Sequence, residues 1–320
     1  MFEVSQIFVP VDTSRGSRAA LGLAKSLMGL ASAPSLEMVH VLPQMPEYMH
    51  KTLFPYAAMG EDEVEFEQEL ISATKAGLEK LLEPPYHASI ECLIGNPKTT
   101  LSQHLLSSPA NLVVMGAFGE GGPLPSSIGS TAAHIVRTSS HPVLLAKDLH
   151  PTPKIQHILC ALDLTPNSYH ILEVALSLAL DLDAKFSAIF ILPDPLAQDP
   201  HNLLANHLQH SPEQLIAKEQ PKLEALFERC FQSINLPFPL KKKAQNLWKK
   251  REITTGHVAH TITKYADDVQ ADLIVLGASH APESPRPGLT CLDVMTSATT
   301  HTLVVPLPHA SPHATPNDQL

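Results

Sequence analysis

The chain has 320 residues, enough for two domains of ordinary size, and it carries a formal net charge of −10 at pH 7. This acidic balance argues against a general nucleic-acid-binding protein. The sequence does not open with a basic segment followed by an apolar core, and the uncharged stretch 101–119 contains many polar residues, so we expect a cytoplasmic protein with neither a leader peptide nor a membrane span.

Short apolar segments alternate with longer helical patterns through the first half of the chain. Segments rich in Val, Ile and Leu predict five strands, near residues 5–11, 36–42, 88–94, 111–116 and 142–146. Their continuous apolar character is typical of strands buried on both faces of a parallel sheet. A helical pattern with an acidic start, from Glu61 to Leu82, separates the second strand from the third. The first half therefore predicts a doubly wound α/β domain.

The second half of the chain repeats the first. The segment Ile7 to Asp12 matches the segment Ile158 to Asp163, and further matches follow in the same order as far as the last strand. Two such halves predict an α/β protein with two tandem doubly wound five-stranded parallel-sheet domains. We place the first domain at 1–147, a linker rich in proline at 148–153, the second domain at 154–307 and a flexible tail at 308–320.

The most specific motif follows the fourth predicted strand. Gly116, Gly119, Gly129 and Ser130 form the spacing G-x2-G-x9-G-S, and a helix-like segment follows from Thr131. Glycines let a backbone pass close to a ligand, and the free N–H groups at a helix start favour an anion. The motif therefore predicts a phosphate-binding loop; the alternative is a plain surface loop before an N-capped helix.

These features resemble the universal stress protein family over roughly residues 3–147 and 154–307. The glycine spacing equals the ATP-binding pattern of that family, and Pro10-Val11-Asp12 after the first strand supports the match. The resemblance implies a fold like that of the adenine nucleotide alpha-hydrolases. It also implies that the first domain holds an adenine nucleotide, ATP with or without Mg²⁺.

The resemblance implies roles for residues at the adenosine end of the site. Asp12 and the backbone at Val11, next to Pro10, would border the adenosine, and Val41 would present backbone groups to the adenine edge. Two alternatives stay open: Asp12 could cap the following helix, and Val41 could belong to the core. Gly95, after the third strand, could serve the turn alone.

The resemblance also implies roles at the phosphate end. Met115 and Gly116 would line the ribose and the start of the phosphates. The residues that would hold the phosphates are Gly119, Gly129, Ser130 and Thr131. One departure from the family pattern lies inside this loop, where Phe118 stands in place of a frequent histidine.

The second domain departs further from the pattern. Asp163 and Gly277 remain, but His280 occupies the position of the second glycine and Leu289 that of the third. Side chains at these points would crowd a phosphate, and the charge of Glu283 would repel it. We therefore expect a second domain that keeps the fold without a nucleotide.

The favoured function is that of a nucleotide-binding regulatory protein of the stress response, acting on an unknown protein partner. The sequence contains no Walker-type lysine after the glycine loop and no evident pair of nucleophile and base. We therefore expect no catalytic residues and at most weak ATP hydrolysis. Two alternatives stay open: a slow or autophosphorylating ATPase, and an interaction protein that binds no nucleotide.

The last predicted strand of each half, Val143 to Ala146 and Leu303 to Val305, is continuously apolar. Such a strand at a sheet edge promotes aggregation unless it is covered. Because the two halves share one chain, we expect each strand to cover the other in an intramolecular pseudo-dimer. Independent domains are the alternative, and a homodimer of the whole chain also stays open.

The cysteines and histidines predict neither a disulfide framework nor a metal site. The four cysteines form no C-x-x-C pair, and the eighteen histidines are scattered. The densest histidine group, His201, His207 and His210, has no carboxylate or cysteine at ligand spacing.

Overall fold

The computed structural model describes residues 1–12, 14–44, 61–82, 88–119, 127–147, 154–165, 167–193, 212–278 and 288–306. The predicted linker at 148–153, the tail at 308–320, the histidine group and the substituted loop around Glu283 lie outside these residues.

The first half contains the strands and helices that its apolar pattern predicts. Its elements are β1 (Gln6–Pro10), α1 (Arg15–Leu27), β2 (Ser35–Leu42), α3 (Glu61–Glu79), β3 (Ala88–Ile94), α4 (Pro97–Ser107), β4 (Leu112–Gly116), α5 (Ser130–Thr138) and β5 (Val143–Ala146). Each strand lies within one or two residues of its expected position, because a largely apolar segment is most stable between two layers of helices.

The second half repeats this order, with one more helix among the described residues between its second and third strands. Its elements are β6 (His157–Leu162), α6 (Ser168–Asp181), β7 (Lys185–Pro193), α8 (Pro212–Ser233), α9 (Phe238–Leu247), β8 (Arg251–Gly256), α10 (Val258–Asp268), β9 (Leu273–Ala278), α11 (Leu289–Ser297) and β10 (His301–Pro306).

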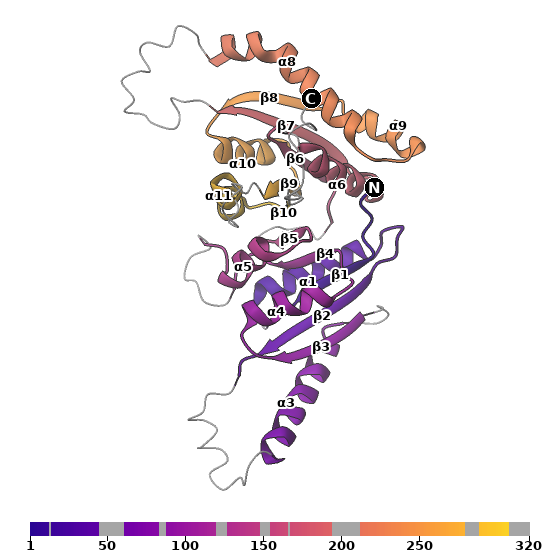
Figure 1. Ribbon diagram of the computed structural model, residues 1–320, viewed down its shortest axis with the longest axis vertical. Coiled ribbons are helices and arrows are strands. Elements are labelled where there is room, and N and C mark those ends of the chain that lie inside the picture. Colours follow the sequence, from indigo (N-terminus) through magenta and orange to yellow (C-terminus); the bar gives the residue numbers. More distant parts are fainter. Residues whose placement is uncertain are drawn as a thin grey trace, which may run out of the picture.

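The described strands form one 10-stranded sheet, ordered β3-β2-β1-β4-β5-β10-β9-β6-β7-β8. The pairs within each half are parallel, and the two halves meet where β5 and β10 pair antiparallel, with Leu303 opposite Leu144 and Val304 opposite Val143. Figure 1 shows the halves stacked along the long axis of the molecule with these strands at their junction. The expected fold class is confirmed, and the apolar last strands cover each other.

Two apolar clusters pack on the two faces of this sheet. Helices α1, α3, α6, α8 and α9 contribute to one cluster, and α4, α5, α10 and α11 contribute to the other. Leu144 and Leu303 belong to the first cluster, whereas Val143 and Val304 belong to the second. Each core layer therefore continues across the boundary between the halves. Within the described part of the chain, no helix combines the length and the apolar character that a bilayer crossing needs.

Candidate functional site

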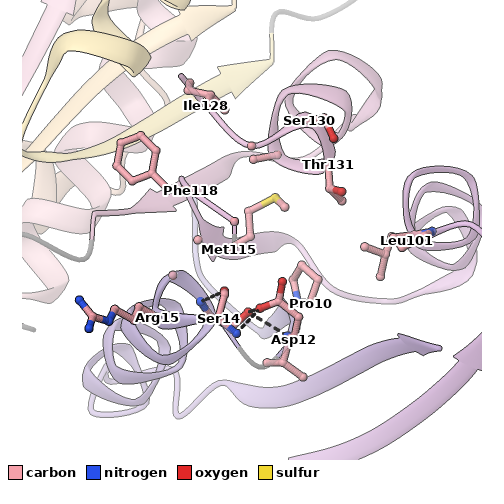
Figure 2. Close-up of a pocket in the computed structure, with 18 of the residues that line it drawn as sticks. Pro10, Asp12, Ser14, Arg15, Leu101, Met115, Phe118, Ile128, Ser130 and Thr131 are labelled. Atoms are coloured by element: carbon pink, nitrogen blue, oxygen red, sulfur yellow. Dashed lines mark hydrogen bonds between the residues drawn. The ribbon is translucent and has the colours of Figure 1, made fainter. Parts of the chain in front are cut away.

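A cavity of about 1140 Å³ opens at the carboxyl ends of β1 and β4 in the first half. The chain leaves these neighbouring strands in opposite directions, toward β2 and toward β5, and such a switch point is where doubly wound sheets bind ligands. All of the residues proposed from the sequence line this cavity: Pro10, Val11, Asp12, Val41, Met115, Gly116, Gly119, Gly129, Ser130 and Thr131. Figure 2 shows Pro10 and Asp12 at the end of β1, Met115 on β4, and Ser130 and Thr131 at the start of α5.

Asp12 is bound into the start of α1. One carboxylate oxygen, Oδ1, accepts hydrogen bonds from the backbone N–H of Ser14 (2.9 Å) and from the Ser17 hydroxyl (2.5 Å). The backbone N–H of Asp12 in turn donates to Ser17 Oγ (2.9 Å). The residue that caps α1 is Ser14, which accepts from the Ser17 N–H. Asp12 therefore stabilises the start of α1 in addition to any contact with a ligand. This role is close to the helix-capping role that the sequence left open.

These hydrogen bonds favour the ionised form of the Asp12 carboxyl. Burial by itself would raise the pKa of the carboxyl, but the hydrogen bonds from Ser14 and Ser17 outweigh it and hold the pKa below the usual 3.8. The group is consequently ionised at neutral pH, and it remains exposed at the edge of the cavity.

The backbone of Val41 faces the cavity for a geometric reason. β1 pairs with β2 only as far as Pro10 opposite Val39, and the Val39 carbonyl still accepts from the Val11 N–H (2.9 Å). Alternate residues of a strand direct their backbone groups to the same side. The N–H and C=O of Val41 therefore point to the same side as those of Val39, beyond the end of β1. His40 lies beside them, with Nδ1 2.7 Å from the Val11 carbonyl.

The three loop glycines have different reasons to be glycine. A Cβ on Gly116 would lie 2.6 Å from the carbonyl carbon of Gly16, so this glycine lets α1 pack against the end of β4. Among the described residues, a Cβ on Gly119 would meet nothing within 4 Å, and one on Gly129 would come no closer than 3.4 Å, to the Gly119 nitrogen. Gly129 also has an unstrained φ of −55°. The fold thus explains Gly116, whereas Gly119 and Gly129 leave space that the fold does not use.

The start of α5 is open toward this space. Gly129 provides no side-chain cap, and the first turn, which begins with Ser130 and Thr131, contains no acidic residue. The first N–H groups of a helix have no intrahelical partner and carry the positive end of the helix dipole. A hydrogen bond from the Gly129 N–H to the Ala117 carbonyl (2.9 Å) holds the two ends of the loop together. The arrangement suits an anion.

Sequence reasoning missed other residues of the lining. Arg15 and Arg18 line the cavity from the first turn of α1, and both are exposed. Their signal was available, because Arg15 and Arg18 follow within six residues of Asp12, after the end of the first strand. In Figure 2 the Arg15 guanidinium points away from Ser130 and Thr131.

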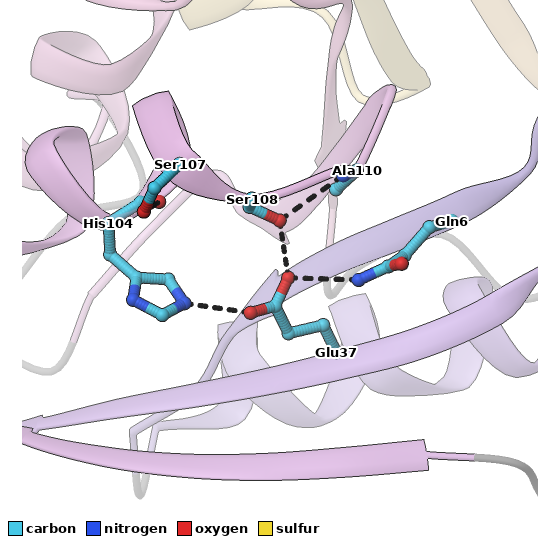
Figure 3. Close-up of polar contacts among 6 residues, drawn as sticks. All are labelled: Gln6, Glu37, His104, Ser107, Ser108 and Ala110. Atoms are coloured by element: carbon cyan, nitrogen blue, oxygen red, sulfur yellow. Dashed lines mark hydrogen bonds and ion pairs between the residues drawn. The ribbon is translucent and has the colours of Figure 1, made fainter.

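The wall formed by α4 is fixed by a buried carboxylate. Pro97 and Leu101 of α4 line the cavity, and Glu37 of β2, whose side chain is 8% exposed, binds the other end of this helix. Glu37 accepts from His104 Nε2 (2.7 Å), from Ser108 Oγ (2.5 Å) and from Gln6 Nε2 (3.1 Å). Figure 3 shows these side chains converging on the carboxylate from the helix end and from β1.

The turn before α4 explains Gly95. Gly95 has φ +150°, and a Cβ there would lie 2.4 Å from Thr100 Oγ1. Gly256 of the second half repeats both features, with φ +145° and Thr261 Oγ1 at 2.7 Å. Turn chemistry, the alternative left open by the sequence, thus accounts for this glycine.

The second half preserves the aspartate arrangement. Asp163 Oδ1 accepts from the Thr165 N–H (3.1 Å), the Thr165 hydroxyl (2.8 Å) and the Ser168 hydroxyl (2.6 Å). Gly277 lies within β9, as Gly116 ends β4. The loop that would follow, 279–287, lies outside the described residues, so the comparison of the two glycine loops rests on the sequence.

The family model described as "Universal stress protein family" matches the chain twice, over residues 3–147 and 154–306. Among solved structures, a universal stress protein from Archaeoglobus fulgidus DSM 4304 has a TM-score of 0.61 and 14% identity, with 97% of this chain and 100% of that chain covered. A functionally unknown protein from Pseudomonas aeruginosa PAO1 has a TM-score of 0.59 and 15% identity, with 95% and 93% covered. At these identities the likeness shows the fold. A search of curated proteins finds no match.

Proposed function

Because the chain belongs to the universal stress protein family, we propose that it is a regulatory protein of the stress response whose first domain binds one adenine nucleotide, ATP in the first instance. The observation that carries this proposal is the space at Gly119 and Gly129. In the part of the chain that the structure describes, neither backbone conformation nor packing requires a glycine at these two positions, and both border the uncapped start of α5. A phosphate chain at this point would accept hydrogen bonds from the free N–H groups and from Ser130 and Thr131.

The other end of the cavity suits an adenosine. The Val41 backbone offers one donor and one acceptor beyond the end of β1, a pattern that can pair with the edge of adenine. Met115 and Leu101 supply apolar surface for a base and a sugar. The ionised Asp12 at the cavity edge can accept from ribose hydroxyls through the oxygen that its bonds to Ser14 and Ser17 leave over.

Regulation fits the site better than rapid turnover. Among the described lining residues, the charged ones are Asp12, Arg15 and Arg18. Asp12 already accepts two hydrogen bonds, and its lowered pKa makes it a weak base. Binding would therefore act by favouring one conformation or one protein partner.

Calorimetric titration of the full chain with ATP tests the proposal. We expect a stoichiometry near one, because the second domain has His280 and Leu289 at its matching glycine positions. A stoichiometry near two would contradict the asymmetry between the domains. An absence of binding heat, together with no adenine nucleotide released from the heat-denatured protein by mass spectrometry, would favour an interaction protein that needs no nucleotide.

A further inference from the structure

Lys147 is a buried lysine at the junction of the two domains. It follows directly after β5, and it is 1% exposed. Lysine is almost never fully buried unless its ammonium group has partners, because removing the charge from water is costly. Its partners come from both domains.

Two donors of Lys147 bind the second domain. Its ammonium nitrogen Nζ donates to the backbone carbonyl of Met295, which lies in the last turn of α11, and its backbone N–H donates to His301 Nδ1 (3.0 Å) at the start of β10. The last carbonyls of a helix lack intrahelical partners and carry the negative end of the dipole. The last turn of α11 contains no basic residue of its own, so the first domain supplies the cation that stabilises this helix end.

The same ammonium group lies against the nucleotide pocket. Lys147 Nζ is 4.6 Å from the ring centre of Phe118, and Phe118 lines the cavity immediately before Gly119. In Figure 2 the ring points away from Ser130 and toward the ribbon of the second half. The loop backbone is tied to the same place, because the Ala117 N–H donates to the Ala146 carbonyl (2.9 Å). A cation over an aromatic face is attracted most strongly when both are removed from water.

We propose that Lys147 is a positioning residue of the nucleotide pocket, and that through Phe118 and Lys147 a nucleotide in the first domain orders the end of α11 in the second. The inference rests on the proposed function. Phosphates bound at Gly119 and Gly129 restrain the loop that contains Phe118, the ring restrains the ammonium group, and the ammonium group restrains the Met295 carbonyl. Coupling of binding energies is reciprocal, so the contact with α11 also strengthens nucleotide binding.

The second half does not repeat this lysine. When His301 is aligned with His141, the position that matches Lys147 is Leu307, which cannot provide a cation. The second domain therefore has no matching lysine of its own with which to contact the first domain. The contact with Lys147 gives the second domain a use that does not require a nucleotide of its own.

Hydrogen exchange of the full chain, with and without saturating ATP, tests the inference. In the wild type we expect ATP to slow exchange in segment 127–138 and also in segment 289–297. In Lys147→Met, which keeps the length of the side chain, protection of 127–138 should remain while protection of 289–297 is lost. The affinity for ATP should fall roughly threefold to thirtyfold, the range that a cation–π contact can supply. Lys249→Met, at an exposed lysine, is the control and should behave as the wild type.

The second variant, Phe118→Leu, keeps an apolar side chain and removes the aromatic face, so it should also lose protection of 289–297 even if Lys147→Met folds poorly. If ATP protects 127–138 but leaves 289–297 unchanged in the wild type, the inference is overturned and the proposed function stands. If both segments are unchanged, both fail. Wild-type behaviour of Lys147→Met and of Phe118→Leu would show that the link does not pass through these residues.

Discussion

The glycines of the pocket serve two purposes, close packing of the backbone and room for a ligand. Because different residues serve them, substitutions can test each purpose separately. Gly116 faces Gly16 across a contact that leaves no room for a Cβ. Gly119 and Gly129 line the cavity, and the described residues leave room for a Cβ at either position. The sequence motif presents all three as one pattern, because a spacing of glycines does not tell whether the neighbour is a backbone or a ligand.

Gly129→Val should weaken ATP binding at least tenfold, about 1.4 kcal/mol, because a branched side chain would occupy the mouth of the α5 N-terminus. The backbone at Gly129 has φ −55° and ψ 139°, a region that valine adopts without strain. The free energy of unfolding should therefore stay within roughly 0.5 kcal/mol of the wild type.

Gly116→Ala is the matched variant and should behave in the opposite way. The added Cβ would lie 2.6 Å from the backbone of Gly16, so α1 must shift, at a cost of roughly 1–3 kcal/mol of stability. Calorimetry and urea unfolding of both variants decide the matter. Wild-type ATP affinity in Gly129→Val would show that the loop is not the phosphate site.

His157 should make the stability of the protein depend on pH. Burial lowers the pKa of His157 below its usual 6.5. Its Nδ1 lies 3.0 Å from the Val269 carbonyl and Nε2 lies 2.8 Å from Ser187 Oγ. In the neutral ring, Nδ1–H therefore donates to the carbonyl, and Nε2 accepts from the hydroxyl. The unfolded chain binds a proton at His157 near pH 6.5, whereas the folded protein binds it only at a lower pH. The contribution of His157 to the free energy of unfolding is therefore fully present above pH 6.5 and is lost as the pH drops from there toward the folded pKa.

Urea unfolding at pH 5 and pH 7 measures this dependence. Trp248 is the single tryptophan of the chain and lies buried in the second domain, so its fluorescence follows the domain that contains His157. The comparison variant is His157→Gln, which places there the residue found at the matching position of the first half, Gln6. Its loss of stability between pH 7 and pH 5 should be smaller than that of the wild type. An equal loss would contradict the role of His157.

At the scale of the elements, the positions of the strands were predictable from the sequence, whereas the hydrogen bonds between polar side chains of different elements were not. β1, β4 and β5 are apolar at nearly every position, and this pattern has few alternatives to a buried parallel strand. Glu37 breaks the pattern inside β2, and its partners Gln6, His104 and Ser108 are 31, 67 and 71 residues away in sequence. Such a cluster becomes visible only when the topology has brought the elements together.

The sequence likewise predicted the lining of the candidate site but not its long-range contacts. Every proposed residue lines the cavity, because the motif follows strand ends that meet at one edge of the sheet. The packing duty of Gly116 depends on Gly16, and the contacts of Lys147 depend on the second domain. The sequence does not reveal either set of contacts, because the residues involved are far apart along the chain.

Glu37→Ala should destabilise the protein by about 2–4 kcal/mol, because it leaves the buried donors of Gln6, His104 and Ser108 without their acceptor. The loss should also loosen α4, whose other end lines the cavity, and so weaken ATP binding. The control is Glu79→Ala, at an exposed position on α3, which should be nearly neutral. Urea unfolding and calorimetry measure the two effects. If Glu37→Ala changes neither the free energy of unfolding nor the affinity for ATP, the hydrogen bonds of Glu37 do not stabilise α4.

At the scale of the whole molecule, the junction between the domains is part of the core. Leu144 is 2% exposed in one apolar layer, and Val304 is 1% exposed in the other. An aspartate at either position would bury an unpaired charge between the domains. The antiparallel pair of β5 and β10 is the only strand pairing between the halves in the described part of the chain. The junction should therefore fail before the parallel sheets on either side of it.

The double variant Leu144→Asp with Val304→Asp should consequently raise the radius of gyration in small-angle scattering. Trp248 lies far from the junction strands in the sheet order, packed against Phe227 and Phe231, and its fluorescence should remain native if the domains separate while staying folded. Leu106→Asp, at a residue that is 81% exposed, is the control and should leave the scattering unchanged. An unchanged radius of gyration in the double variant, or a wild type that already scatters as two separate bodies, would show that the halves do not depend on this junction. Separation should also abolish any effect of ATP on α11, because the contact between Lys147 and Met295 crosses the same boundary.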